Sequence, residues 1–136
     1  MSRRILIAYQ LLIGLSDTAT GALLIVAPAL TLRLMGLHAP SDALPYLSFI
    51  GAFVFSVGLA CLYGAFLMRC DTEKARLEMV WLLTAFSRAA VSIFVFQQVI
   101  SGTLEAGWLT VALSDGAMVV IQAIGLRRGW LANVGR

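Results

Sequence analysis

Charged residues are scarce in this sequence, because Asp, Glu, Lys and Arg together make up only 12% of its 136 residues. An ordinary soluble domain has about a quarter, so these charges are too few to cover a soluble surface. Apolar residues make up 60% of the chain, and they form four long blocks rather than scattered amphipathic stripes. Lipid is therefore the expected solvent of the blocks.

Cysteine and histidine are also rare, which excludes several kinds of site. Cys61 lies inside an apolar block and Cys70 just beyond its end, without a CxxC motif or a pair at metal-ligand spacing. The one histidine, His38, lies between two blocks, so the chain cannot supply two histidines to a haem within the membrane. The sequence has no HExxH motif, phosphate-binding glycine loop or nucleophile with a neighbouring base. We expect no disulfide, no metal, no catalytic residues and no autonomous enzyme activity.

The apolar blocks cover about residues 5–30, 44–68, 77–100 and 107–126, with short polar links between them. At 1.5 Å per residue, about 20 residues cross the roughly 30 Å hydrocarbon core of a bilayer. Since short links make consecutive helices antiparallel neighbours, the sequence predicts an all-α fold: a polytopic bundle of four transmembrane helices, forming one domain over residues 1–136. The first block carries Asp17 in its middle, so we expect a retained helix rather than a cleaved signal peptide.

Basic residues lie almost entirely on one side of such a bundle. Of the ten in the chain, Arg88 is inside a block and Arg33 is alone on one side, which leaves eight on the side of the termini and the second link. These eight are Arg3, Arg4, Arg69, Lys74, Arg76, Arg127, Arg128 and Arg136. The positive-inside rule then predicts a multi-pass protein of the bacterial inner (plasma) membrane with both termini in the cytoplasm. The net charge of +3 does not indicate nucleic-acid binding, since the basic residues are not interleaved with aromatics on one face.

Three ionisable residues lie inside the blocks: Asp17, Arg88 and Asp115. A charge near the bilayer centre is costly, so it normally faces the bundle interior or a wet cavity and has a partner. Counted from the cytoplasmic ends of their helices, all three come out roughly 16 to 18 Å deep at 1.5 Å per residue. We therefore expect one layer near mid-membrane, in which the planar guanidinium of Arg88 pairs with one or both carboxylates.

Further polar residues lie on the same helical faces, four or seven residues from these charges. They are Gln10, Thr84, Ser92 and Gln122. With two carboxylates and one guanidinium, the charge of the layer is balanced by a proton, a cation or a ligand that donates hydrogen bonds. Three interpretations stay open: a buried network that fixes the helix register, a pocket for a ligand or cofactor head group, and a path for protons or ions.

Small residues recur at helical spacing in every block, where they allow close backbone approach without help from the hydrophobic effect. We expect these stripes to serve helix packing within the bundle. The alternative is that one stripe forms the contact of a dimer. They are Gly14, Thr18 and Ala22, then Ser56, Ala60 and Gly64, then Ala85 and Ala89, and finally Ala112 and Gly116.

The size and layout of the chain resemble the DoxX-like group of small bacterial four-helix membrane proteins. Two local features add to the resemblance: residues 14–21 leading to Pro28 and residues 34–37, and Arg88 midway in the third helix. The resemblance implies an accessory membrane subunit, associated in some members with quinone-linked oxidation of sulfur compounds or with redox-protective complexes. This chain, however, has too few cysteines to support thiol chemistry of its own.

We therefore expect a small accessory subunit or binding module, without a cofactor of its own but in contact with a quinone or lipid. Its expected partners are membrane lipid and either other membrane subunits or a second copy of the chain. The competing interpretation is a small dimeric transporter or channel coupled to protons or cations, in which the same aspartates carry the transported charge.

The basic bias generates a topology prediction. Labelling of Cys70 with a membrane-impermeant thiol reagent should occur only from the cytoplasmic side, and reporter fusions should place both termini there. A Cys70→Ser variant controls for labelling elsewhere. Labelling of Cys70 from the periplasm would overturn the orientation.

Overall fold

A computed structural model describes residues 2–70 and 73–133 of the chain, so Arg136, used above for the orientation, lies outside the described residues. The described ranges contain helices and no strands. The long helices are α1 (Arg3–Val26), α3 (Leu44–Arg69), α4 (Lys74–Ile100) and α5 (Leu109–Arg127). Shorter elements are α2 (Pro28–Leu34), η1 (Ser41–Ala43), η2 (Ala106–Trp108) and η3 (Trp130–Asn133).

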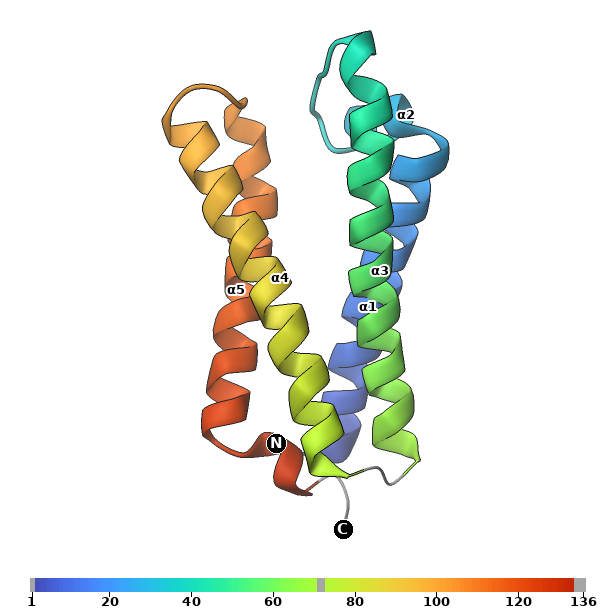
Figure 1. Ribbon diagram of the computed structural model, residues 1–136, viewed down its shortest axis with the longest axis vertical. Helices are drawn as coiled ribbons and strands as arrows, with labels where there is room; N and C mark the ends of the chain where they lie inside the picture. The colour runs from blue at the N-terminus through green and yellow to red at the C-terminus, as the bar shows by residue number, and fades with distance from the viewer. Residues whose placement is uncertain (1, 71–72, 134–136) are drawn as a thin grey trace.

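The long helices form two antiparallel pairs, α1 with α3 and α4 with α5, and both termini lie at the same end of the bundle (Figure 1). Within each pair the helices pack closely, whereas the two pairs approach each other mainly through α3 and α4. All four are long and apolar enough to cross a membrane. The predicted all-α bundle of four transmembrane helices is confirmed, and the chain is a multi-pass membrane protein.

The predicted helix over residues 5–30 is wrong at its end, because α1 stops at Val26 and α2 begins at Pro28. Ala27 between them has φ −143° and ψ 64°, outside the helical region, as expected for a residue before proline. Pro28 occupies the first turn of α2, where its missing N–H costs least. Pro28 thus accounts for the sharp end of α1.

The end of α2 turns the chain back towards the bundle. Gly36 has φ +70°, and the N–H of Leu37 donates to the carbonyl of Leu32 at 2.8 Å. This is the Schellman arrangement, in which a left-handed glycine closes a helix. It buries Leu37 together with Leu32 and Leu47, next to Trp108. Leu47 belongs to α3 and Trp108 directly precedes α5, so this cluster connects the two helix pairs at the end of the bundle away from the termini.

At the terminal end, Arg3 caps a helix far away in the sequence. Its Nε and Nη2 donate to the carbonyl of Met68 at 3.0 and 2.7 Å, and Nη2 also donates to the carbonyl of Arg69 at 3.3 Å. These carbonyls lie in the last turn of α3, where helical partners are lacking. An apolar cluster closes this end of the bundle, formed by Leu6, Leu67, Met68, Leu77, Trp81 and Leu131.

Glycines let α1 and α3 pack with their backbones in contact. A Cβ atom on Gly21 would lie 2.4 Å from the Phe55 nitrogen, and one on Gly58 would lie 2.4 Å from the Thr18 nitrogen. Of the predicted stripe of α3, Gly64 is buried against α1, whereas Ser56 lies off the packed face. Ser56 is exposed and donates to the carbonyl of Ala52 in its own helix at 2.8 Å.

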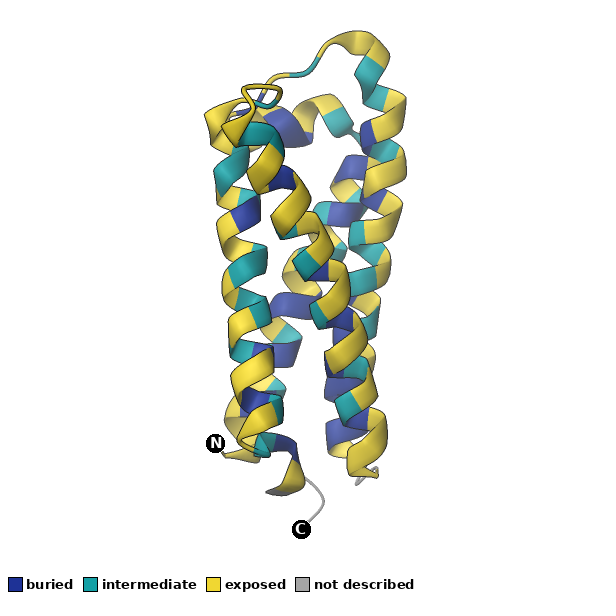
Figure 2. Ribbon diagram, turned by 60° about the vertical axis from the view of Figure 1, so that its left-hand side comes forward, coloured by how far each residue is buried: buried dark blue, intermediate teal, exposed yellow. Residues whose placement is uncertain are grey.

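Large apolar side chains cover the outside of the bundle. Figure 2 shows exposed positions along the outer faces of the helices and buried positions between them. Leu12, Ile93 and Leu113 are among the exposed residues. Exposing apolar area to water costs about 25 cal/mol per Å², so this surface is suited to lipid rather than to water.

The glycine contacts generate a stability prediction. Gly58→Ala should lower the free energy of unfolding by about 1–3 kcal/mol, the usual cost of overpacking, because the new methyl group would meet backbone atoms of α1 that cannot move independently. Thermal unfolding in detergent measures the effect.

Gly116→Ala is the matched control, because its Cβ would meet only the Ser92 hydroxyl, at 3.1 Å. Alanine also favours a helix interior over glycine by up to about 1 kcal/mol, so this variant should be neutral or more stable. Equal losses for Gly58→Ala and Gly116→Ala would contradict the close approach of α1 and α3.

Candidate functional site

Arg88 of α4 joins the two helix pairs near the middle of the bundle. Its Nη1 donates to Oδ1 of Asp115 on α5 at 2.6 Å, and its Nη2 donates to Oδ2 of Asp17 on α1. The arginine side chain is 6% exposed, whereas those of Asp17 and Asp115 are 21% and 17% exposed. The ion pairs predicted for Arg88 are present, while a role of this layer in ligand binding stays a prediction.

The periodicity of α4 explains why Arg88 points inward. The buried side chains of this helix recur at intervals of three, four and seven residues, which places them on one face. They are Leu77, Trp81, Thr84, Arg88 and Val95. A guanidinium fixed on this face requires acceptors, because an unpaired charge is costly at mid-membrane depth.

Every long helix contributes a residue to the surroundings of the guanidinium. Besides the two aspartates, Cys61 of α3 lies beside Arg88 with its thiol near the guanidinium. Cys61 could not be found from the sequence, because α3 is apolar on nearly all faces and hydropathy does not indicate its orientation. Cys61 and Cys70 are both free thiols.

The layer keeps unused hydrogen-bonding capacity. Each aspartate gives one carboxylate oxygen to Arg88, and an ionised carboxylate has a second oxygen that also accepts hydrogen bonds. The Nε of Arg88 is buried and has no partner among the described residues. With two carboxylates against one guanidinium, the layer favours an additional hydrogen-bond donor or positive charge.

The four other predicted polar residues do not join this layer. Ser92 donates to the carbonyl of Ala112 at 2.7 Å and ties α4 to α5 on the side away from the termini. Gln122 Nε2 donates to the Thr84 hydroxyl at 2.8 Å. Gln10 Nε2 donates to the carbonyl of Cys61 at 3.4 Å. These residues thus lie at other depths than the charged layer, and their role in ligand binding stays a prediction.

The two carboxylates lie on helices that hardly pack against each other. Among the described elements, α1 packs chiefly on α3 and α5 chiefly on α4, and the backbones of α1 and α5 do not approach closely. Tyr9 of α1 reaches across, with its hydroxyl 3.5 Å from the sulfur of Met118 on α5. The boundary between α1 and α5 is therefore a loosely packed seam of the bundle. The partly exposed Asp17 and Asp115 lie on the two helices that border this seam.

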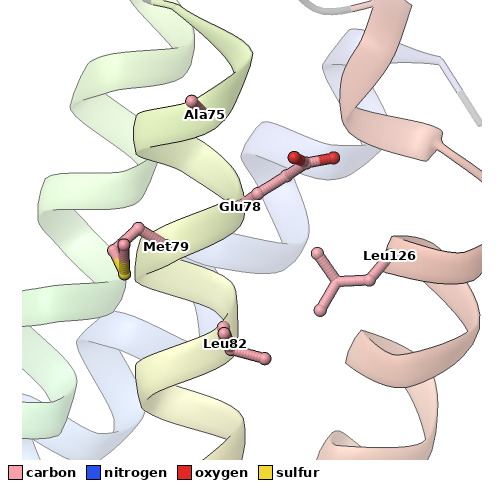
Figure 3. A pocket seen from close by; sticks show the side chains of 5 residues that line it. All are labelled: Ala75, Glu78, Met79, Leu82 and Leu126. Carbon is pink, nitrogen blue, oxygen red and sulfur yellow. The ribbon is translucent and has the colours of Figure 1, made fainter.

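A separate groove lies near the terminal ends of α4 and α5 (Figure 3). It measures about 440 Å³ and is lined by Ala75, Glu78, Met79, Leu82 and Leu126. Glu78 is its one charged lining residue, and this carboxylate pairs with Lys74 at 3.0 Å within α4. The groove does not reach the three charges of the Arg88 layer.

Comparison with known proteins gives no relative: no family model, curated protein or solved structure matches this chain. The described residues contain no group of three or more His, Cys, Asp and Glu side chains placed to hold a metal ion. What the site does must therefore be argued from Arg88 and its neighbours.

The geometry of the layer predicts an order of stability. Arg88→Ala leaves two carboxylates without their cation and should cost about 3–5 kcal/mol, the range for breaking a buried pair from one side. Asp17→Asn or Asp115→Asn alone should cost less, because Arg88 keeps the other carboxylate. Replacing Asp17, Arg88 and Asp115 together by leucine should recover part of the loss.

Thermal unfolding in detergent ranks these variants. Ser87→Ala is the control on α4, since the Ser87 hydroxyl is exposed and bonds only within its own helix, to the Leu83 carbonyl at 3.1 Å. A single aspartate variant as unstable as Arg88→Ala would show that the arginine is not shared between two partners.

Proposed function

We propose that this protein is a small accessory subunit or binding module of a membrane complex, without catalysis of its own, whose charged layer binds the polar end of a lipid-like ligand. One observation carries the proposal. Asp17 and Asp115 each give one oxygen to Arg88, yet both stay partly exposed beside the loosely packed seam between α1 and α5. A molecule arriving from the bilayer has an approach to them there.

The free groups of the layer define the chemistry of the ligand. The donors left on Arg88 belong to a side chain only 6% exposed, whereas the partly exposed aspartates each keep an oxygen that only accepts hydrogen bonds when ionised. The ligand should therefore present an O–H or N–H group, or a positive charge. Among lipid-like molecules, a quinol has two hydroxyl donors, whereas the oxidised quinone has only carbonyl acceptors. The layer thus favours the reduced form.

The resemblance to the DoxX-like group supports the same proposal, because that group includes subunits linked to quinone-dependent oxidation. The proposal includes the bacterial inner membrane and cytoplasmic termini. It is supported by the basic residues exposed at the terminal end of the bundle, where the positive-inside rule expects them. These are Arg4, Arg69, Lys74, Arg76, Arg127 and Arg128.

A small dimeric transporter or channel coupled to protons or cations is the second candidate function. The formal excess of one carboxylate in the Arg88 layer favours it, since intramembrane acids commonly carry protons or cations in transport proteins. In that case purified protein in liposomes should move protons or cations down their gradients. Replacing Asp17 or Asp115 by asparagine should abolish that flux.

The binding proposal predicts selective stabilisation by a quinol. In nanodiscs under anaerobic conditions, a short-chain quinol should raise the unfolding temperature more than the corresponding quinone. At a concentration 100 times its dissociation constant, a ligand stabilises the folded state by about 2.7 kcal/mol. A hydrogen bond to a charged group contributes about 1.5–3 kcal/mol, so losing both carboxylates should weaken quinol binding at least tenfold.

The test variant is Asp17→Asn with Asp115→Asn, and Asp42→Asn in the exposed η1 segment is its control. The control should bind the quinol as the unaltered protein does. Equal stabilisation by quinol and quinone, or full retention of quinol binding by the double variant, would contradict the proposal. Flux in liposomes without quinol binding would favour the transporter.

A further inference from the structure

A second buried polar group lies between the Arg88 layer and the terminal end of the bundle. It consists of Gln10 of α1, Trp81 and Thr84 of α4, and Gln122 of α5, none of them more than 3% exposed. Each lies four or seven residues closer to the terminal end than the charge on its own helix. At 1.5 Å per residue, the group is roughly 6 to 11 Å from the charged layer.

Three polar atoms of this group are buried without a hydrogen-bond partner among the described residues. They are Gln10 Oε1, Gln122 Oε1 and Trp81 Nε1. The indole N–H can only donate and the amide oxygens can only accept. Leaving such atoms unpaired in a low-dielectric interior is unfavourable, and buried polar groups normally have a protein or water partner.

The hydrogen bonds of the two amides fix which of their atoms is unpaired. The Thr84 hydroxyl donates to the carbonyl of Val80 at 2.9 Å, so it can only accept from Gln122 Nε2. The carbonyl of Cys61 likewise requires the donor end of Gln10. Turning the Gln10 amide would break its bond, and turning the Gln122 amide would take the Thr84 hydroxyl from Val80 and leave Nε2 unpaired instead of Oε1. The two oxygens therefore remain unpaired.

Glycines on the facing helices make room for this group. A Cβ atom on Gly64 of α3 would lie 2.5 Å from Gln10 Nε2, and one on Gly125 of α5 would lie 2.5 Å from Cζ3 of Trp81. Towards the termini, Leu6, Leu77 and Leu131 close the bundle. The group is thus enclosed by close packing and an apolar cluster, so its unpaired atoms are shielded from bulk water.

We propose that Gln10, Trp81 and Gln122 form a binding site for internal water. Water accepts the Trp81 N–H and donates to the glutamine oxygens, which supplies the partners that these three atoms lack. The inference does not depend on the lipid-like ligand, because none of the three residues belongs to the Arg88 layer. The protein then holds water between the charged layer and the leucines that close the terminal end of the bundle.

Radiolytic footprinting in nanodiscs tests the proposal. X-rays generate hydroxyl radicals from water bound next to a side chain, so buried Trp81 should be oxidised when water lies beside it. Radicals generated chemically in bulk solution should leave it intact. Met68 is the internal control, since it is 0% exposed, packs in the same apolar cluster as the Trp81 ring without belonging to the glutamine group, and has a readily oxidised sulfur. We expect several-fold faster oxidation of Trp81 than of Met68 under X-rays.

Two variants assign the water to the glutamines. Gln10→Leu with Gln122→Leu should reduce the X-ray oxidation of Trp81 towards that of Met68. Should the pair fail to fold, Gln122→Leu alone gives a second reading by the same X-ray oxidation of Trp81; its unfolding temperature is no measure of the water, because the variant also loses the bond to Thr84. Trp81 as resistant as Met68 in the unaltered protein, or Trp81 oxidation unchanged in the leucine variants, would overturn the inference.

Discussion

The double ion pair of Arg88 is the interaction on which the rest of the bundle depends. In lipid, apolar side chains gain nothing by leaving their surroundings, so helices associate through close packing and polar contacts. Close backbone packing through glycines holds α1 against α3, while hydrogen bonds tie α4 to α5. Arg88 connects these two pairs, because Asp17 belongs to one pair and Asp115 to the other.

This connection divides the interior by depth. Apolar clusters occupy both ends, around Leu6 and Leu77 at the terminal end and around Leu37 at the other. The charged layer and the glutamine group lie between them, away from bulk water at either surface. An electrostatic interaction is stronger in such surroundings than at a surface, so the same enclosure that makes the charges costly also makes their pairing decisive for stability.

Much of this arrangement could be predicted from the sequence, for identifiable physical reasons. Four apolar blocks of sufficient length give the helices, and counting residues from the helix ends places Asp17, Arg88 and Asp115 at one depth. The break at Ala27 was missed, although Pro28 marks it. The contact face of α3 and the place of Cys61 beside Arg88 could not be found, because a helix apolar on all sides carries no periodic signal of its orientation.

The sequence separation of the ion pairs also has a consequence for how the protein is made. Asp17 and Arg88 are 71 residues apart, and Arg88 and Asp115 are a further 27 apart. The ribosome therefore delivers Asp17 to the membrane long before its counter-ion exists, and Asp115 only with α5. Until α4 enters the membrane, the acid in α1 lacks its counter-ion, which is costly in hydrocarbon. The two halves of the layer are thus joined only when spans made far apart in time have met.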